Sequence, residues 1–494
     1  MRLEQASIFR NLGLILQFNG LLYTVPAAFA ILSGEEPEAV AILLGAFTSL
    51  GVGFICSNVK GEEKMDYGSL SILVVVSFIM LGAVGSISYL YLHQQLFPSQ
   101  DTLTKIVSSY FESISAITTT GLTVFNDPAT LPRSIIFYRA VTQWFGGIGI
   151  VFFILLFLNA PSRYSRALDA FGGFSRLASS SRGTFLHIMR IYALYTGLFI
   201  LLLATLGFID PFAAVMISLT GISTGGMSHT ANLGNDLTPI GFWIVIILMI
   251  VGATSFPIHE RLWGRKVGGT FQTEFKTFLI YIAGISIFTI LLANSQNILD
   301  LREVGFHMVS AASTTGFQLG PLTTLNPVAR LIIALVMFVG GCSFSTAGGI
   351  KIIKMLVAIK SIPWIVKNNV LPSSAVTLVK IGKTVFFEKE IAQVLVMIFT
   401  GAAFIIVGSA VLTMTGSSFL NAFFETISAF SNTGLSTGIT SMTMPNFVKI
   451  VLVFEMIVGR VEIIPIIIAI RYVYLKIITL DAQQVVHSKW YQKS

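Results

Sequence analysis

Charge is scarce in this sequence. Asp, Glu, Lys and Arg make up only 11% of its 494 residues, whereas 54% of the residues are hydrophobic. Soluble domains carry about a quarter charged residues, so this chain cannot cover the surfaces of several soluble domains. The composition therefore excludes a soluble enzyme, a disordered regulator and a secreted disulfide scaffold. An integral membrane protein made of many helices remains.

Cysteine is scarce as well. Cys56 and Cys342 are the only two, and both lie in apolar or Gly/Ser-rich sequence, which excludes a disulfide framework and a zinc site. No paired catalytic carboxylates and no Ser/His/Asp set are visible among the apolar segments, so no enzyme is predicted. Glycine, in contrast, is abundant, with 43 residues. This abundance suggests close helix contacts or backbone that is exposed for a purpose.

Ten apolar stretches are about as long as a membrane span, which needs roughly 20 residues. They lie at 11–32, 39–57, 68–92, 135–158, 191–209, 240–258, 277–294, 328–360, 391–413 and 447–470. Shorter, semi-polar stretches that end in Thr/Gly-rich sequence lie near 104–121, 210–226, 300–316 and 418–434. These are too short to cross a bilayer and are typical of re-entrant segments buried within protein.

The Lys and Arg residues predict the orientation of these spans. With the N-terminus in the cytoplasm, the inner side collects 24 of the 31 Lys and Arg residues, and the first outer loop, 33–38, holds none. This distribution follows the positive-inside rule and places both termini in the cytoplasm. The net charge of +8 is therefore a sign of membrane topology and gives no support to nucleic-acid binding.

One motif recurs in all four short stretches. FESISAITTTGL at 111–122 and FETISAFSNTGL at 424–435 are identical at eight of twelve positions, and MISLTGISTGGM at 216–227 and FHMVSAASTTGF at 306–317 align with them without gaps. A glycine fills one column: Gly121, Gly226, Gly316 and Gly434. A hydroxyl lies six residues earlier: Ser115, Thr220, Ser310 and Ser428. Sixteen residues before the glycine are the helix N-cap candidates Asp210, Asp300 and Ser418, whereas the first repeat has Lys105 there, beside Thr104.

The repeats predict four units, each with an outer helix, a short capped helix, a Thr/Gly strand and an inner helix. Around one axis, four extended Thr/Gly segments can point backbone carbonyls into a narrow lumen, where a ring of carbonyls replaces the water around a monovalent cation. The short helices would aim their negative C-terminal ends at the same axis. We expect the units at 65–160, 161–266, 267–362 and 363–494, the last with a cytoplasmic tail, after an N-terminal membrane hairpin at 1–64.

These residues resemble the Trk/Ktr/HKT superfamily of potassium uptake proteins, and within it the TrkH family of Trk-type pore subunits. QWFGGIGI at 143–150, GGCSFSTAGGIKIIK at 340–354 and VGRVE at 458–462 add to the resemblance, and the hairpin at 11–57 is similar to the Trk branch. The resemblance implies potassium as substrate, held at Thr119, Thr120, Gly121, Thr224, Gly225, Gly226, Thr314, Thr315, Gly316, Asn432, Thr433 and Gly434. In this superfamily a serine in place of the first-repeat glycine accompanies sodium preference, so Gly121 favours potassium.

The stretch 328–360 is too long for one untilted helix, and its centre reads GGCSFSTAGG, with Gly340, Gly341, Gly348 and Gly349. Glycine is poor in helix interiors, so we predict a helix that is broken midway. The resemblance implies a gating loop in the membrane just below the Thr/Gly segments. The alternative is a kink for close helix packing. No GxxxxGK[ST] pattern occurs here, so a phosphate-binding loop is excluded.

Arg460 lies in the middle of the last predicted span. A charge there is costly and usually faces water or a partner. We predict that it forms an electrostatic barrier below the Thr/Gly segments, as the resemblance also implies. The alternative is a structural ion pair with Glu455 or Glu462, although Glu462 is only two residues away and cannot share a helix face with Arg460.

Glu112 and Glu425 occupy one column of the repeat, and we favour a structural role for both. The other two repeats have Ile217 and His307 there, so no four-fold carboxylate ring of the kind that suits calcium is present. His229 lies in an outer loop without metal-ligand companions in the sequence and is predicted to be solvated.

The sequence thus predicts an all-helical membrane protein that moves potassium inward across a bacterial cytoplasmic membrane, with no cofactor. A sodium-preferring relative, an intramembrane enzyme and a secondary transporter with inverted repeats stay open as alternatives. The residues do not decide between a passive channel and a proton- or sodium-coupled symporter. The resemblance also implies a homodimer and a separate cytosolic nucleotide-binding regulatory subunit.

Overall fold

The structure is a computed structural model that describes residues 3–60, 65–125, 127–149, 181–261, 269–294, 301–372 and 377–475. Apart from turns and loops, the described residues form helices and one short antiparallel hairpin, β1 (Val379–Ile381) with β2 (Thr384–Phe386). An N-terminal hairpin of α1 (Leu3–Leu32) and α2 (Glu36–Ser57) comes first, as predicted. It packs against the first unit, where α1 and α2 contact both its outer and its inner helix.

Four units follow, each with an outer, a short and an inner helix. They are α3 (Tyr67–Leu96), α4 (Thr102–Ile117) and α5 (Arg133–Ile148); α8 (Ser181–Thr205), α9 (Pro211–Ile222) and α10 (Pro239–Gly252); α12 (Gly269–Asn294), α13 (Leu301–Ala312) and α14 (Pro327–Phe338); and α16 (Glu388–Thr413), α17 (Phe419–Phe430) and α18 (Asn446–Val461). A 3-10 turn precedes the inner helix in three units, η1 (Pro128–Thr130), η2 (Leu233–Asn235) and η3 (Leu322–Thr324). The remaining helices are α11 (Phe256–Arg261), α15 (Ile352–Val370) and a last helix, Ile463–Leu475.

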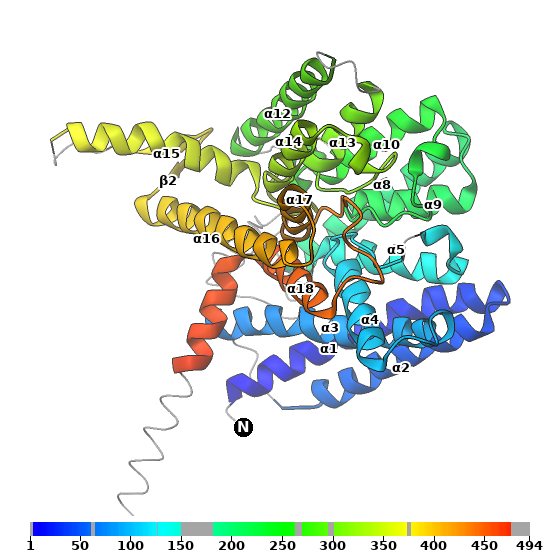
Figure 1. Ribbon diagram of the computed structural model, residues 1–494. Coiled ribbons are helices and arrows are strands. Elements are labelled where there is room, and N and C mark those ends of the chain that lie inside the picture. The colour runs from blue at the N-terminus through cyan, green and yellow to red at the C-terminus, as the bar shows by residue number, and fades with distance from the viewer. Residues whose placement is uncertain are drawn as a thin grey trace, which may run out of the picture.

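The four units close into a ring. Each inner helix contacts its own short helix and the short helix of the next unit: α5 with α4 and α9, α10 with α9 and α13, α14 with α13 and α17, and α18 with α17 and α4. The last of these contacts joins the fourth unit back to the first. The short helices therefore surround one axis, with their C-terminal ends turned toward the centre of the molecule (Figure 1).

Side-chain caps start three of the short helices. Asp210 accepts hydrogen bonds from the backbone N–H groups of Phe212 and Ala213, and Ser418 accepts one from Asn421 N, as predicted. Asp300 lies outside the described residues. In the first unit, where the sequence offered no cap candidate in this column, the cap is Asp101, whose carboxylate accepts a hydrogen bond from Thr104 N at 2.9 Å. The reason is that α4 has 16 residues whereas the other three short helices have 12, so it starts one turn earlier.

All four inner helices end sooner than the spans predicted for them, and each ends at a similar distance along the chain from the glycine of its repeat. The predicted span 240–258 ends as a helix at Gly252, and 447–470 ends at Val461, where Glu462 has φ +67° before the last helix begins. The predicted span 135–158 ends as a helix at Ile148, and its residues 150–158 lie outside the described residues. Only the break in 328–360 was predicted, although Gly146, Gly147 and Gly149 also cluster at the end of the first inner helix.

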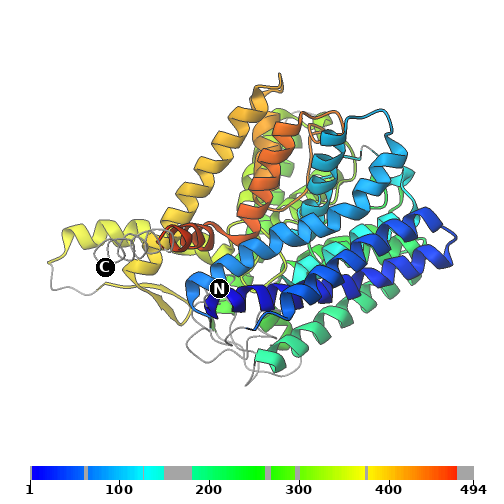
Figure 2. The same cartoon turned by 90° about the horizontal axis from the view of Figure 1, so that it is seen from below.

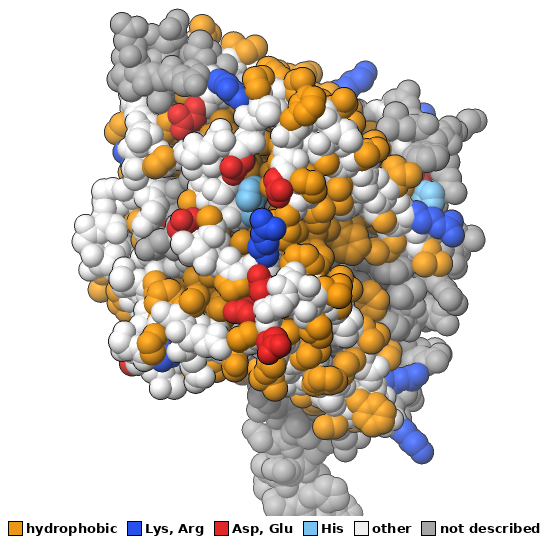
Figure 3. Space-filling view, turned by 90° about the vertical axis from the view of Figure 1, so that its right-hand side faces the viewer, with side chains coloured by type: hydrophobic (Ala, Val, Ile, Leu, Met, Phe, Trp, Pro, Cys, Tyr) orange, Lys and Arg blue, Asp and Glu red, His pale blue; other side chains and the backbone are white. Residues whose placement is uncertain are grey.

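Five helices are long and apolar enough to cross a membrane among the residues described. Large hydrophobic side chains such as Phe47, Phe54 and Phe399 are exposed on the outer surface of these helices, which suits contact with lipid. Figure 3 looks onto the side of the molecule that contains the turn between α1 and α2, where charged side chains gather near the centre and hydrophobic ones surround them. The start of α1, the last helix and α15 lie on the opposite side (Figures 1 and 2).

Candidate functional site

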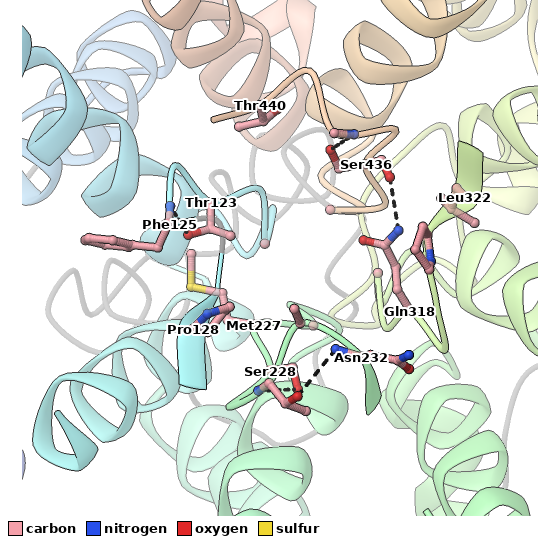
Figure 4. A pocket seen from close by; sticks show the side chains of 18 of the residues that line it. Thr123, Phe125, Pro128, Met227, Ser228, Asn232, Gln318, Leu322, Ser436 and Thr440 are labelled. Atoms are coloured by element: carbon pink, nitrogen blue, oxygen red, sulfur yellow. Dashed lines mark hydrogen bonds between the residues drawn. The ribbon is translucent and has the colours of Figure 1, made fainter. Parts of the chain in front are cut away.

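The four Thr/Gly segments meet at the centre of the ring. Their glycines, Gly121, Gly226, Gly316 and Gly434, all line one cavity of about 660 Å³. The residue two positions after each glycine lines it too, namely Thr123, Ser228, Gln318 and Ser436, and Figure 4 shows these four side chains around its walls. Gln318 Nε2 donates a hydrogen bond to Ser436 O at 3.0 Å, which ties the third segment to the fourth.

The backbone of the four segments is nearly identical. The residue two positions before each glycine has a left-handed φ of 50–56°, at Thr119, Thr224, Thr314 and Asn432. Each glycine also has a positive φ, between 68° and 93°. Residues other than glycine adopt such angles rarely and at a cost of about 1–3 kcal/mol, so four occurrences at one repeat position indicate a conformation that the fold imposes.

The amide groups of each segment point back to the short helix that precedes it. Thr120 N donates to Ser115 O at 2.9 Å, and the matching amides of Gly225, Thr315 and Thr433 do the same at 2.8–2.9 Å. These bonds satisfy carbonyls that a helix end leaves without a partner. They also leave the carbonyl groups of the segments free to face the axis or a neighbouring segment.

Each glycine is pressed against the carbonyl of the next segment. A Cβ added to Gly434 would overlap Thr120 O, one added to Gly316 would overlap Thr433 O, one added to Gly226 would overlap Thr315 O, and one added to Gly121 would overlap Gly225 O. These four contacts form a closed circle. Any side chain in the glycine column would therefore push a carbonyl of its neighbour out of place.

In three repeats, the hydroxyl that lies six residues before the glycine forms a hydrogen bond with the end of the Thr/Gly segment. Ser115 Oγ donates to Leu122 O and Ser310 Oγ donates to Phe317 O, in each case the residue after the glycine. Ser428 Oγ instead accepts from Gly434 N at 3.0 Å. Thr220 is the exception, because its hydroxyl donates to Met216 O within its own helix.

Three of the four residues in the repeat column of Glu112 bind the chain just after the repeat glycine. Glu112 is fully buried, accepts hydrogen bonds from Thr123 Oγ1 and Val124 N, and forms an ion pair with Arg139 at 2.9 Å. Glu425 Oε1 accepts bonds from Ser436 Oγ and Thr440 N in the fourth repeat. His307 Nε2 accepts one from Leu319 N in the third repeat. These contacts are structural, in keeping with the role favoured for Glu112 and Glu425, and Ile217 makes no such bond because it has no polar atom.

We expect Arg139→Met to lower the free energy of unfolding by about 3–5 kcal/mol, because it leaves the Glu112 carboxylate buried without its partner charge. The measurement is thermal unfolding of the purified protein in detergent. The double variant with Glu112→Gln removes both charges and should recover part of this loss. Equal stability of Arg139→Met and the unmodified protein would show that the pair contributes nothing.

His229 is less solvated than predicted. Its side chain is only 16% exposed, and Nε2 lies 3.3 Å from Asp236 Oδ2. His229 precedes the 3-10 turn η2 in the chain and Asp236 follows it, so this turn brings the two side chains together. The sequence spacing did not indicate this contact, since it depends on how the outer loop folds.

The glycine-rich centre of 328–360 is a loop between α14 and α15. Gly340 N donates to Ile350 O at 2.9 Å, and Ile350 N donates to Phe338 O at 3.0 Å, so the two ends of the loop run side by side. Gly349 has φ +65°, and a Cβ on Gly340 would overlap Gly348 O. The broken helix is therefore as predicted, and its glycines are needed for the backbone to approach itself.

The tip of this loop contacts the Thr/Gly segments on the side away from the cavity. Gly348 N donates to Thr314 Oγ1 at 2.7 Å, and Thr346 Oγ1 lies 3.2 Å from Thr224 Oγ1. A Cβ on Gly348 would overlap Ser431 O, whereas Gly341 lies against Ala253 at the end of α10. The loop thus packs against the second, third and fourth Thr/Gly segments.

Arg460 joins this loop to the first unit through backbone carbonyls. Its NH1 donates to Thr346 O at 3.1 Å, and its NH2 donates to Gly146 O at 2.6 Å and to Gly147 O at 3.3 Å. In the part of the chain that the structure describes, Arg460 pairs with no carboxylate. Glu462 forms an ion pair with Lys354 at 2.6 Å, and Glu455 Oε1 lies against Gly408. The alternative of an ion pair with Glu455 or Glu462 is therefore wrong.

Two residues that contact the glycine-rich loop or a Thr/Gly segment had no role assigned from the sequence. Glu274 Oε1, from α12, accepts hydrogen bonds from Ser343 N at 2.8 Å and from Ile353 N at 3.1 Å, so one buried carboxylate oxygen holds the loop to the start of α15. Gln143 contacts the second Thr/Gly segment. Gln143 begins the motif QWFGGIGI, which was the only signal for it. Glu274 lies just before the predicted span 277–294, and no signal in the sequence pointed to it.

Comparisons with known proteins agree with this architecture. The sequence model of a family described as "TrkH: Cation transport protein" matches residues 74–474. An uncharacterized cation transporter of Methanocaldococcus jannaschii is 30% identical over 96% of this chain and 97% of its own length. The Trk system potassium uptake protein TrkH of Escherichia coli K12 is 27% identical over 92% of this chain and 96% of its own. The crystal structure of the potassium transporter TrkH from Vibrio parahaemolyticus superposes with a TM-score of 0.80 at 24% identity, over 95% of this chain and 98% of that one. This likeness of fold confirms the predicted all-helical, four-repeat architecture.

Proposed function

Because the chain belongs to the TrkH family of cation transport proteins, which are transporters and not enzymes, we propose that it carries potassium ions inward across the cytoplasmic membrane. The family resemblance seen in the sequence is confirmed, and the chain is a multi-pass membrane protein. The finer statements that follow, on the ion, its site and its control, are our proposal.

The closed circle of glycines and carbonyls is the observation that carries this proposal. Four segments with one backbone conformation surround a single axis, and their carbonyls are not consumed by helical hydrogen bonds. Backbone carbonyls in a ring can replace the hydration shell of a potassium ion. We therefore propose the ion site at Thr119–Gly121, Thr224–Gly226, Thr314–Gly316 and Asn432–Gly434. Gly121 in the first repeat favours potassium over sodium.

Relatives support the choice of ion. Several proteins that align over more than nine-tenths of this chain are described as Trk system potassium uptake proteins. The archaeal relative is described only as a cation transporter. The sodium-preferring alternative is less favoured, because the serine that accompanies sodium preference in this superfamily is absent and Gly121 stands in its place.

The direct test is ion flux into proteoliposomes that contain the purified protein. Potassium and rubidium should pass well ahead of sodium. Equal flux of the three ions would contradict a carbonyl filter selective for potassium. A pH gradient or a sodium gradient imposed across the vesicles separates the two modes of transport, because only a coupled symporter would accumulate rubidium against its own gradient.

We propose that the loop 339–351 is the gate and that Arg460 holds it closed. The loop lies at the inner end of the ring, against Thr224 and Thr314, where it would block an ion that has passed the glycines. The guanidinium of Arg460 adds a positive charge at the same level and binds the loop to α5. Either effect opposes the passage of a cation.

Glu274 provides a test of the gate that does not touch the ion path. We expect Glu274→Ala to raise basal rubidium flux several-fold, since it leaves one backbone N–H group of the loop and one at the start of α15 without an acceptor, at a cost of about 1–3 kcal/mol each. Glu388→Ala, at an exposed position in the first turn of α16, serves as the control. If flux through Glu274→Ala equals that of the control, the ends of the loop do not govern the gate.

The orientation and the partners are part of the same proposal. We propose that both termini are cytoplasmic, since the start of α1 and the last helix lie on the side that carries α15 and its lysines (Figure 2). This side would meet a cytosolic nucleotide-binding regulatory subunit. A homodimer, with one pore in each chain, is proposed from the family alone.

A further inference from the structure

One of the four Thr/Gly segments lacks a side chain that the others have. Thr120, Thr315 and Thr433 precede the glycine in the first, third and fourth repeats, and Gly225 takes that place in the second. Each of the three threonine hydroxyls is hydrogen-bonded at 2.8 Å to a hydroxyl two residues earlier, on Thr118, Ser313 and Ser431 respectively. The second repeat keeps the earlier hydroxyl, on Ser223, but has no partner side chain for it at Gly225.

The side chain of Gln143 fills the place of the missing threonine. A Cβ built on Gly225 would lie 2.5 Å from Gln143 Cδ, 2.6 Å from Oε1 and 2.7 Å from Nε2. These distances are far shorter than van der Waals contact, so a threonine and the glutamine amide cannot both occupy this space. Gln143 is fully buried. It comes from α5, the inner helix of the first unit, and reaches across to the second.

Small residues on α5 allow this approach. One turn after Gln143, Gly146 lies against Ile117 O at the end of α4, and Gly147 lies against Ser223 at the end of α9. A Cβ at either glycine would overlap these neighbours. The helix α5 therefore packs closely between the C-terminal ends of α4 and α9. This position directs the side chain of Gln143 at the second Thr/Gly segment.

The amide of Gln143 makes two hydrogen bonds with this segment. Nε2 donates to Gly225 O at 2.7 Å, and Oε1 accepts from Met227 N at 3.0 Å. The partners fix the orientation of the amide, because a backbone N–H can only donate and a backbone carbonyl can only accept. Gln143 thus brackets Gly226 from both sides along the chain.

The bond to Gly225 O makes the four segments unequal. This carbonyl occupies the same place in the circle of contacts as the carbonyls of Thr120, Thr315 and Thr433. A donor on a carbonyl holds it in one direction and reduces the negative potential that it offers to a cation. The ion would then meet three carbonyls of one kind and one that is held by a side chain.

We propose that Gln143 is a specificity-determining residue of the ion site: it replaces the absent threonine side chain of the second repeat and, through Gly225 O, sets the preference for potassium over sodium. This inference rests on the proposed potassium site. It assigns to α5 a part of the site that the repeat motif alone does not contain.

The first test separates the two hydrogen bonds. Gln143→Glu keeps an oxygen that accepts from Met227 N but has no N–H for Gly225 O, whereas Gln143→Met removes both bonds at similar length. We expect both variants to lower the ratio of potassium to sodium permeability by about five- to tenfold, the effect of one hydrogen bond of about 1 kcal/mol or slightly more. Trp144→Phe is the matched control, since it removes a hydrogen bond from the same helix to Thr196, outside the site.

The second test restores the missing side chain. Gly225 does not have a positive φ, so its backbone suits a threonine, and Gln143→Ala removes the amide that a Cβ there would meet first. Gly225→Thr alone should disrupt the site, whereas Gln143→Ala with Gly225→Thr should recover most of the potassium preference that Gln143→Ala loses. A structural role for Gln143 elsewhere in α5 would not be rescued by a threonine at position 225.

Three results would be informative. Unmodified protein that is selective, with selectivity lost in Gln143→Glu and Gln143→Met and recovered in the double variant, supports the inference. Unmodified protein that is selective, with variants of unchanged selectivity, overturns the inference and leaves the potassium site intact. Unmodified protein that shows no preference among the ions overturns the proposed site itself and the inference with it.

Discussion

Gly121→Ser should abolish the preference for potassium over sodium, lowering the permeability ratio by about tenfold or more. The residue has φ +90°, where any side chain costs about 1–3 kcal/mol. The serine Cβ would also overlap Gly225 O, so either this carbonyl or the first segment must move. A ring of carbonyls that has lost its spacing no longer substitutes for the hydration shell of potassium.

Flux of potassium, rubidium and sodium into proteoliposomes measures this effect. Gly416→Ser is the matched control, because Gly416 has φ +88° but no atom within 4 Å of its would-be Cβ. The control carries the same backbone strain without the overlap, and it lies in the loop between α16 and α17. Unchanged selectivity in Gly121→Ser, at normal expression, would mean that the Thr/Gly segments are not a potassium filter.

Arg460→Ala should raise basal ion flux by about tenfold or more. A unit charge close to the path of a cation contributes a barrier of about 1–4 kcal/mol at the effective dielectric of a protein, and each 1.4 kcal/mol is about a tenfold change in rate. The substitution also removes the hydrogen bonds that hold Thr346 O to Gly146 O through the guanidinium. Both effects act in the same direction.

Arg460→Lys distinguishes the charge from the tether. A lysine keeps the positive charge, but its compact ammonium lacks the fork that donates to two segments at once. Flux should stay low in this variant if the charge is the barrier and should rise as in Arg460→Ala if the tether is what matters. Arg133→Ala, at the outer start of α5, is the control. Unchanged flux in both Arg460 variants would remove Arg460 from the account of the gate.

The sequence was sufficient to predict the four repeats, because each repeat is a short, continuous stretch of the chain. Twelve aligned residues in each of four copies placed the glycines, the hydroxyls and the short helices. The break in 328–360 was also predictable, since Gly340 and Gly349 stand in an apolar span where glycine is unfavourable. In each case the signal lies within one segment of the chain.

The ends of the other inner helices were not predicted. Ile148 is followed by Gly149, which has φ +77° and is a typical helix stop, but this signal was not used. Gly252 and Val461 are followed by Ala253 and Glu462, which give no such signal. At the end of α10 the packing is close: a Cβ on Gly252 would meet Gly221 O and Ile222 O, and the neighbouring loop binds Ala253 O through Cys342 N. A pattern of apolar residues continues past such a point, so the spans were drawn too long.

Contacts between residues far apart in the sequence could not be predicted either, because they depend on how the helices pack. Gln143 is 82 residues from Gly225, and Glu274 is 69 residues from Ser343. The column of Glu112 was seen in the sequence, but its pairing with Arg139 depends on α4 and α5 lying side by side. The cap of α4 was not identified for a simpler reason: the alignment was ungapped, whereas this helix has an additional turn.

The most direct test of the central claim is to locate the ion. Crystals grown with rubidium should show an anomalous peak on the axis between Gly121, Gly226, Gly316 and Gly434. Excess potassium should displace that peak, and the same concentration of sodium should not. A peak elsewhere in the molecule, the absence of any peak on the axis, or equal displacement by sodium would contradict the claim that these four segments form a potassium site.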